Sequence, residues 1–109
     1  MVEAPAASVL ITVNVPPAAE ERFVDWLLSS DVVAGFTSVA AYGHGARHDH
    51  LSVAEQVRGR QRRIEFRMQL AADALDDFVA ALEAGFRGVD LYFFATPVLR
   101  WGHLGEIVK

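Results

Sequence analysis

The chain of 109 residues contains no cysteine, which excludes disulfide bonds, thiol nucleophiles and thiolate ligands for a metal ion. It has no apolar run of the roughly 20 residues that a membrane helix needs. The opening Met-Val-Glu-Ala-Pro does not place a basic region before an apolar one, as a secretory signal would. We therefore expect a cytoplasmic protein that does not span a membrane.

Sequence motifs of common enzyme classes are also missing. There is no Gly-x-Ser-x-Gly elbow to expose a serine nucleophile, and no Gly-x-x-x-x-Gly-Lys-Ser/Thr phosphate loop. Ser52 and His50 are close in the sequence, but no third group is placed to orient them as nucleophile and base. These absences favour a protein that is not an enzyme.

The net charge of −4 argues against a nucleic-acid binder, which usually carries an excess of basic residues. The charge is unevenly distributed, because residues 42–67 carry six arginines and residues 71–90 carry five acidic residues and one arginine. A local basic patch can bind an anion even on an acidic protein. Hydrophobic residues make up 52% of the chain. There are two explanations for this high share. One is a common enrichment in alanine and valine, and the other is apolar surface that is buried between subunits.

Hydrophobic periodicity predicts four strands and two helices. β-branched and aromatic runs indicate strands, and apolar residues at helical spacing indicate helices. The clearest strand alternates apolar and polar residues from Arg63 to Leu70. The predicted elements are, in chain order, strand 7–15, helix 17–30, strand 36–42, strand 63–70, helix 75–86 and strand 90–96.

This order predicts an α+β, ferredoxin-like βαββαβ fold, with two helices on one face of a four-stranded antiparallel sheet and a long loop between strands two and three. A single domain over residues 1–109 fits the chain length, with residues 1–6 as a flexible tail. Residues 98–109 form an extension that adds a short edge strand or wraps onto a neighbouring subunit. Its Trp101 anchors against that subunit or packs into its own core.

The second face of the sheet is predicted to be bare in a monomer. On the third strand this face carries side chains of mixed sign, either in solvent or at a junction between subunits. They are Arg63, Glu65, Arg67 and Gln69.

The loop over residues 43–62 is the strongest candidate for the functional part, because polar loops of this length are uncommon in small domains. Three histidines, His44, His48 and His50, lie within seven residues. Imidazole suits divalent copper, zinc, nickel or cobalt. The ordinary explanation is that these are polar loop residues that favour water.

The same loop is rich in arginine, whose forked guanidinium grips phosphate or carboxylate. Gly43 and Gly45 permit backbone conformations closed to other residues and expose N–H groups to an anion. A solvated, charged edge that prevents aggregation is the competing explanation. The arginines are Arg47, Arg58, Arg60, Arg62 and Arg63.

Four stretches carry a resemblance to a known family. They are Gly35-Phe-Thr-Ser38, Gly43-His-Gly45-x-Arg47-His48, Leu51-Ser-x-Ala-Glu-Gln-Val-Arg-Gly-Arg-Gln-Arg-Arg63 and Thr96-Pro-Val98. With the element order and the position of the long loop, they resemble the PII-like signalling proteins. The closest resemblance is to an uncharacterised PII-like family encoded beside heavy-metal efflux systems.

The resemblance implies a homotrimer with its sheets turned inward, ligand clefts between subunits, and a 43–62 loop that corresponds to the PII effector loop, the T-loop. PII proteins bind adenine nucleotides in those clefts. Here Asp49 replaces a glycine of the loop start. Gly88-Val-Asp90-Leu91 stands where PII proteins carry a Gly-Asp-Gly-Lys phosphate turn. These departures argue against the usual mode of ATP binding and favour metal sensing.

The sequence thus predicts a non-enzymatic regulator whose loop senses a divalent metal ion through His44, His48 and His50 and controls a partner such as a membrane efflux protein. One alternative ligand is an adenine nucleotide or another anion. A ligand-free protein-interaction module is the other alternative. The residues expected to bind the anion are Gly43, Gly45, Arg47, Arg58, Arg60 and Arg62.

Overall fold

A computed structural model describes residues 7–44 and 60–105 of the chain. The expectations for residues 1–6, for most of the 43–62 loop and for the last four residues lie outside this range. The elements are, in chain order, β1 (Ser8–Val15), a 3-10 turn η1 (Pro17–Ala19), α1 (Glu20–Leu28), β2 (Phe36–Gly43), β3 (Gln61–Ala71), a 3-10 turn η2 (Ala72–Ala74), α3 (Leu75–Gly85) and β4 (Tyr92–Val98).

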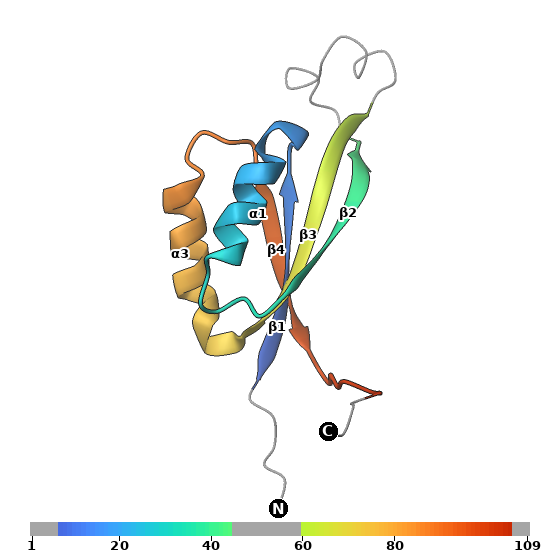
Figure 1. The fold of residues 1–109 in the computed structure, drawn as a ribbon, viewed down its shortest axis with the longest axis vertical. Helices are drawn as coiled ribbons and strands as arrows, with labels where there is room; N and C mark the ends of the chain where they lie inside the picture. Colours follow the sequence, from blue (N-terminus) through green and yellow to red (C-terminus); the bar gives the residue numbers. More distant parts are fainter. Residues whose placement is uncertain (1–6, 45–59, 106–109) are drawn as a thin grey trace, which may run out of the picture.

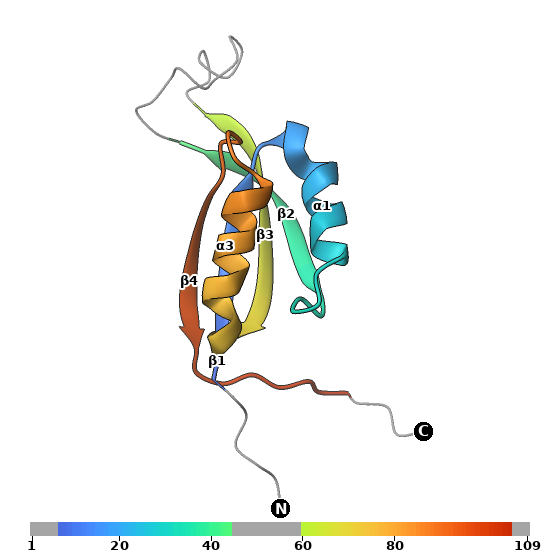
Figure 2. The same ribbon diagram turned by 90° about the vertical axis from the view of Figure 1, so that its left-hand side faces the viewer.

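The four strands form one antiparallel sheet in the order β2-β3-β1-β4. Both helices cover the same face of this sheet (Figure 1), and they lie side by side when the molecule is turned by 90° (Figure 2). The predicted ferredoxin-like βαββαβ fold is therefore confirmed.

The core forms between the helices and the sheet face that they cover, because alternate residues of β1 and β3 point the same way. Phe23 of α1 lies at the centre of this core and is fully buried. Its ring centroid lies 4.8 Å from that of Phe66 on β3 and 5.3 Å from that of Phe86 after α3. The other buried apolar residues are Ile11, Val13, Val15, Ala19, Leu27, Met68, Leu70, Phe78 and Leu82.

Three of the differences between the observed and the predicted element boundaries have a structural reason or extend an element by two residues. The first helix ends at Leu28, and the Ser29 hydroxyl then donates to the Trp26 carbonyl at 2.9 Å. β3 begins at Gln61, two residues before the predicted start. β4 continues through Pro97, which is tolerated because an edge strand needs no donor on its outer side.

The turn from α3 to β4 uses a left-handed residue, Gly88, with a φ of 80°. The Val89 N–H donates to the Phe86 carbonyl at 3.1 Å within this turn. Only glycine adopts this φ without steric strain. The turn brings Asp90 to the second position before β4, where its carbonyl accepts from the same arginine, Arg63, that contacts Asn14 near the end of β1.

The sheet face opposite the helices carries exposed apolar side chains beside buried polar ones. Tyr92 and Phe94 on β4 are 52% and 51% exposed, and Val39 on β2 is 39% exposed. Thr12 and Asn14 on β1 are both 5% exposed. Trp101 beyond β4 is 54% exposed, so it does not pack into its own core. No helix in the described ranges is long and apolar enough to span a bilayer.

Candidate functional site

The candidate site lies where the long loop leaves and rejoins the sheet. Gly43 pairs with Gln61, and Tyr42 pairs with Arg62, so β2 and β3 hold the two ends of the loop side by side. Figure 1 shows this end of the sheet extending beyond the helices. The structure describes Gly43, His44, Arg60 and Arg62 of the predicted site. The other predicted residues lie outside the described ranges: Gly45, Arg47, His48, His50 and Arg58.

Gly43 is an ordinary strand residue rather than the special turn residue that the sequence suggested. It is the last residue of β2, and positive φ values occur among the described glycines only at Gly88 and Gly105. A Cβ at position 43 would lie 3.5 Å from Cγ of Arg63, which is normal van der Waals contact. The backbone at Gly43 therefore does not require glycine.

An aromatic residue and two arginines lie at the base of the loop. The guanidinium carbon of Arg60 lies 4.1 Å from the centre of the Tyr42 ring, an attractive cation–π geometry. Arg60 Nε is buried without a hydrogen-bond partner in the described part of the chain. Arg62 pairs directly with Tyr42 across the strands, so both side chains lie on the same face of the sheet.

A cleft of about 310 Å³ opens beside this group, between the start of α1 and strands β2 and β3. Tyr42 and Ser38 of β2 contribute hydroxyl groups, and Arg62 contributes a positive charge. Among the described residues, Glu20, the first residue of α1, is the only acidic one that lines the cleft. The cleft therefore offers several donors on its strand side and one carboxylate acceptor on its helix side.

Arg63 is buried, in contrast to its neighbour Arg62, and it is 3% exposed. Its Nε donates to the Asn14 side-chain oxygen. Its Nη2 donates to the backbone carbonyls of Asn14 at 3.0 Å and Asp90 at 2.6 Å. The remaining nitrogen, Nη1, lies 3.4 Å from the Asp90 carboxylate. The sequence grouped Arg63 with the basic residues of the loop, but the structure shows that it joins β3, β1 and the turn before β4.

The sequence did not identify Asn14, Asp90 and Tyr42 as members of this region. Asn14 was counted within an apolar strand. Asp90 was taken as the start of the last strand and as part of a departure from a phosphate-binding turn. An acceptor near the end of β1 and an acidic residue just before β4 are weak signals on their own. Their role depends on the register that places Glu65 opposite Asn14 and so brings Arg63 to the same end of the sheet.

Among the described residues, no group of three His, Cys, Asp or Glu side chains is arranged to hold a metal ion. His44 is the first residue after β2, and the two other histidines of the predicted metal set lie outside the described ranges. The described part of the site is therefore basic and aromatic in character.

A family model described as "Protein of unknown function (DUF3240)" matches residues 6–105. No curated relative matches the sequence. Among solved structures, a DUF3240 family protein from Shewanella baltica OS155 is similar, with a TM-score of 0.75 and 15% identity over 92% of this chain and 99% of that one.

Two further structures of similar fold carry nucleotides. CPII, a nitrogen regulatory PII-like protein from Thiomonas intermedia K12, was solved bound to ADP, AMP and bicarbonate; it has a TM-score of 0.63 and 16% identity over 84% of this chain and 90% of that one. The Bacillus subtilis GlnK–ATP complex has a TM-score of 0.62 and 15% identity over 87% of this chain and 85% of that one. At these identities the likeness shows that this chain has a PII-like fold.

Proposed function

The chain belongs to the DUF3240 family, and on that premise we propose that it is a non-enzymatic regulatory protein of PII type that binds a phosphate-bearing ligand at the base of its long loop. An adenine nucleotide is the preferred ligand. The observation that carries this proposal is that Arg60 lies over the Tyr42 ring and Arg62 is the strand partner of Tyr42, beside the 310 Å³ cleft that Tyr42 and Arg62 line.

The polarity of the cleft suits a nucleotide better than a simple anion. Guanidinium groups bind phosphate with charge-assisted hydrogen bonds, so the phosphates belong at Arg60 and Arg62. Glu20 on the opposite wall repels a phosphate, but it accepts hydrogen bonds from hydroxyl groups such as those of ribose. A ligand with an anionic end and a hydroxyl-bearing end satisfies both walls. This arrangement supports a nucleotide in this chain although it lacks the Gly-Asp-Gly-Lys turn of PII proteins.

The position of the cleft suggests how ligand binding changes the conformation of the long loop. Arg62 lies in β3 and Arg60 directly precedes that strand, at the point where the loop rejoins the sheet. A ligand held there favours those loop conformations in which both arginines face the cleft. A ligand shifts such an equilibrium only by its difference in affinity for the two states. The loop also carries the other residues predicted to bind the anion, Gly45, Arg47 and Arg58. In the ligand-bound state it presents a different surface to a partner such as a membrane efflux protein.

We place the protein in the cytoplasm as a homotrimer whose open sheet faces turn inward. The support for this assembly is the exposed apolar side chains at both edges of that face, Val39 on β2 and Tyr92 and Phe94 on β4. Large apolar side chains exposed on one face of a sheet are typical of subunit interfaces.

Replacing both Arg60 and Arg62 by glutamine should weaken nucleotide binding by about two orders of magnitude. Each hydrogen bond to a charged group contributes roughly 1.5–3 kcal/mol, and about 1.4 kcal/mol corresponds to a tenfold change in Kd. The measurement is isothermal titration of ATP, ADP and AMP into the full chain at low salt. The nucleotide recovered afterwards should be chemically unchanged, as expected for a protein that is not an enzyme.

The matched control for this titration is Arg87→Gln, which removes an exposed arginine in the turn after α3. It should leave the Kd unchanged. The proposal is wrong if no nucleotide binds the unaltered chain, or if the double variant and the control bind with the same affinity. A nucleotide present at about 100 times its Kd should also stabilise the fold by roughly 2.7 kcal/mol, which a thermal-shift assay detects independently.

A divalent metal ion remains the second candidate, because His44 stands at the first loop position beside the arginines and two further histidines follow within the loop. Titration of Cu²⁺, Zn²⁺, Ni²⁺ and Co²⁺ into the chain and into the triple variant His44→Ala, His48→Ala, His50→Ala tests this candidate. Metal sensing predicts a large loss of affinity in the triple variant. Equal affinity for both chains would exclude a histidine site in the loop.

A further inference from the structure

The side of the cleft formed by the start of α1 provides few hydrogen-bond donors. Pro16 and Pro17 carry no N–H group. The N–H of Ala19 donates to the Pro16 carbonyl at 2.9 Å, and the N–H of Glu20 donates to the Pro17 carbonyl. The start of a helix ordinarily binds anions through free N–H groups. In this cleft, most of the donors that would bind a phosphate group at the helix are therefore missing or occupied.

Glu20 adds a carboxylate to the same side of the cleft. An ionised carboxylate only accepts hydrogen bonds, and it repels a phosphate group more strongly in a partly enclosed site than in open water. The positive charge lies on the other side, where Arg62 lines the cleft and Arg60 lies over the ring of Tyr42. The strand side therefore suits a phosphate group, and the helix side suits hydroxyl groups.

Given the proposed nucleotide site, on which this inference rests, we propose that Glu20 is a specificity-determining residue that restricts the cleft to nucleoside monophosphates. The phosphate group binds at Arg60 and Arg62, and the ribose hydroxyls donate to the Glu20 carboxylate. Two guanidinium groups balance the roughly two negative charges of a monophosphate at neutral pH. A second and a third phosphate group add negative charge that faces Glu20 instead of a further cation, so ATP binds more weakly than AMP.

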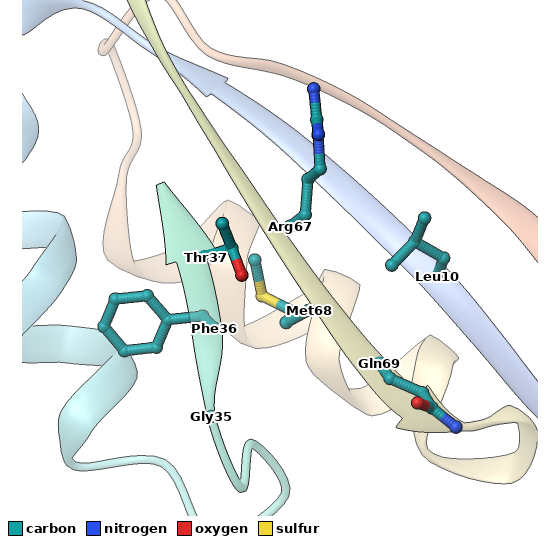
Figure 3. Close-up of a pocket in the computed structure, with 7 residues that line it drawn as sticks. All are labelled: Leu10, Gly35, Phe36, Thr37, Arg67, Met68 and Gln69. Atoms are coloured by element: carbon teal, nitrogen blue, oxygen red, sulfur yellow. The ribbon is translucent and has the colours of Figure 1, made fainter. Parts of the chain in front are cut away.

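A second groove, of about 370 Å³, lies near the start of β2 and also holds an arginine (Figure 3). Among the described residues that line it, Arg67 is the only charged one. The Arg67 guanidinium makes a long ion pair with Glu65 at 3.8 Å. A nucleotide bound in this groove would depend on Arg67 and would be indifferent to Glu20. The variant Arg67→Gln therefore separates the two sites.

Isothermal titration compares AMP, 2′-deoxy-AMP and ATP, each added to the full chain at low salt and without divalent cations. AMP should bind about tenfold more tightly than 2′-deoxy-AMP, because one hydrogen bond to a charged group contributes about that factor. AMP should also bind about tenfold more tightly than ATP, because the added phosphates are repelled by Glu20. ADP should lie between AMP and ATP.

Two variants of Glu20 test its role in these ratios. Glu20→Gln keeps the size of the side chain and removes its charge, so AMP and ATP should then bind with similar affinity. Glu20→Ala also removes the acceptor, so AMP and 2′-deoxy-AMP should then bind equally well. The matched control is Glu21→Gln, which removes the next acidic residue of the same helical turn, outside the cleft. It should preserve both ratios, as should Arg67→Gln.

The inference is overturned if ATP binds the unaltered chain as tightly as AMP, if Glu20→Gln leaves the AMP-to-ATP ratio unchanged, or if Glu21→Gln abolishes it equally. Weaker binding in Arg67→Gln would overturn it too, because the nucleotide would then occupy the other groove. Circular dichroism confirms that each variant is folded. Failure of the proposed function has a different signature: no nucleotide binds at all, or binding persists when Arg60 and Arg62 are replaced. Nucleotide binding that needs both arginines but ignores Glu20 refutes the role of Glu20 alone.

Discussion

Replacing Phe23 by alanine is expected to lower the free energy of unfolding by about 3–5 kcal/mol, the usual range for removing a buried aromatic side chain. Phe23 is fully buried, and its ring packs against Trp26 of its own helix, Phe66 of the sheet and Phe86 after α3. Phe23 therefore links the first helix both to the sheet and to the end of the second helix. A small domain has a total stability of roughly 5–15 kcal/mol, so this change removes a large fraction of it.

Equilibrium unfolding in urea, followed by circular dichroism, measures the change. Phe23→Leu retains most of the apolar volume and should cost much less. Leu28→Ala, on the same helix but exposed, should change stability by no more than about 0.5 kcal/mol. A Phe23→Ala variant as stable as the Leu28→Ala control would contradict the packing described for this core.

The sequence predicted the elements and their order because the core follows simple periodicity. The residues from Ile64 to Leu70 alternate strictly, so the third strand and its buried face were evident before the structure. Both helices likewise carry their apolar residues on one side. The strand ends were less predictable, since Pro97 is excluded from central strands but not from an edge, and the edge position depends on the strand order.

The candidate site remains a prediction, but the structure separates the roles of its arginines. Composition alone treats Arg60, Arg62 and Arg63 as one basic cluster. Successive strand residues point to opposite faces, so Arg62 shares a face with Tyr42 while Arg63 turns to the other side and is buried. Arg63 is buried because its face of the sheet offers hydrogen-bond acceptors on Asn14 and Asp90. The turn before β4 brings Asp90 there, and no local sequence pattern predicts its contact with Arg63.

Removing the Arg63 side chain, in the variant Arg63→Met, is expected to destabilise the fold by about 3 kcal/mol. Its guanidinium satisfies the Asn14 side chain, the Asn14 carbonyl and the Asp90 carbonyl. A buried acceptor left without a donor costs roughly 1–3 kcal/mol. The ion pair with Asp90 adds little, because that carboxylate is 52% exposed. Arg63→Lys should recover only part of the loss, since an ammonium group cannot reproduce the forked contacts.

Urea unfolding of Arg63→Met, Arg63→Lys and the exposed Arg87→Met measures these differences, and Arg87→Met should be close to neutral. The same variants separate the two roles of the basic cluster. If Arg63 serves the fold and Arg62 the ligand, Arg63→Lys loses stability while its nucleotide Kd, measured where it is folded, changes little. Arg62→Gln should show the reverse. An Arg63→Lys chain of full stability with strongly weakened nucleotide binding would instead place Arg63 in the ligand site, which its burial against Asn14 argues against.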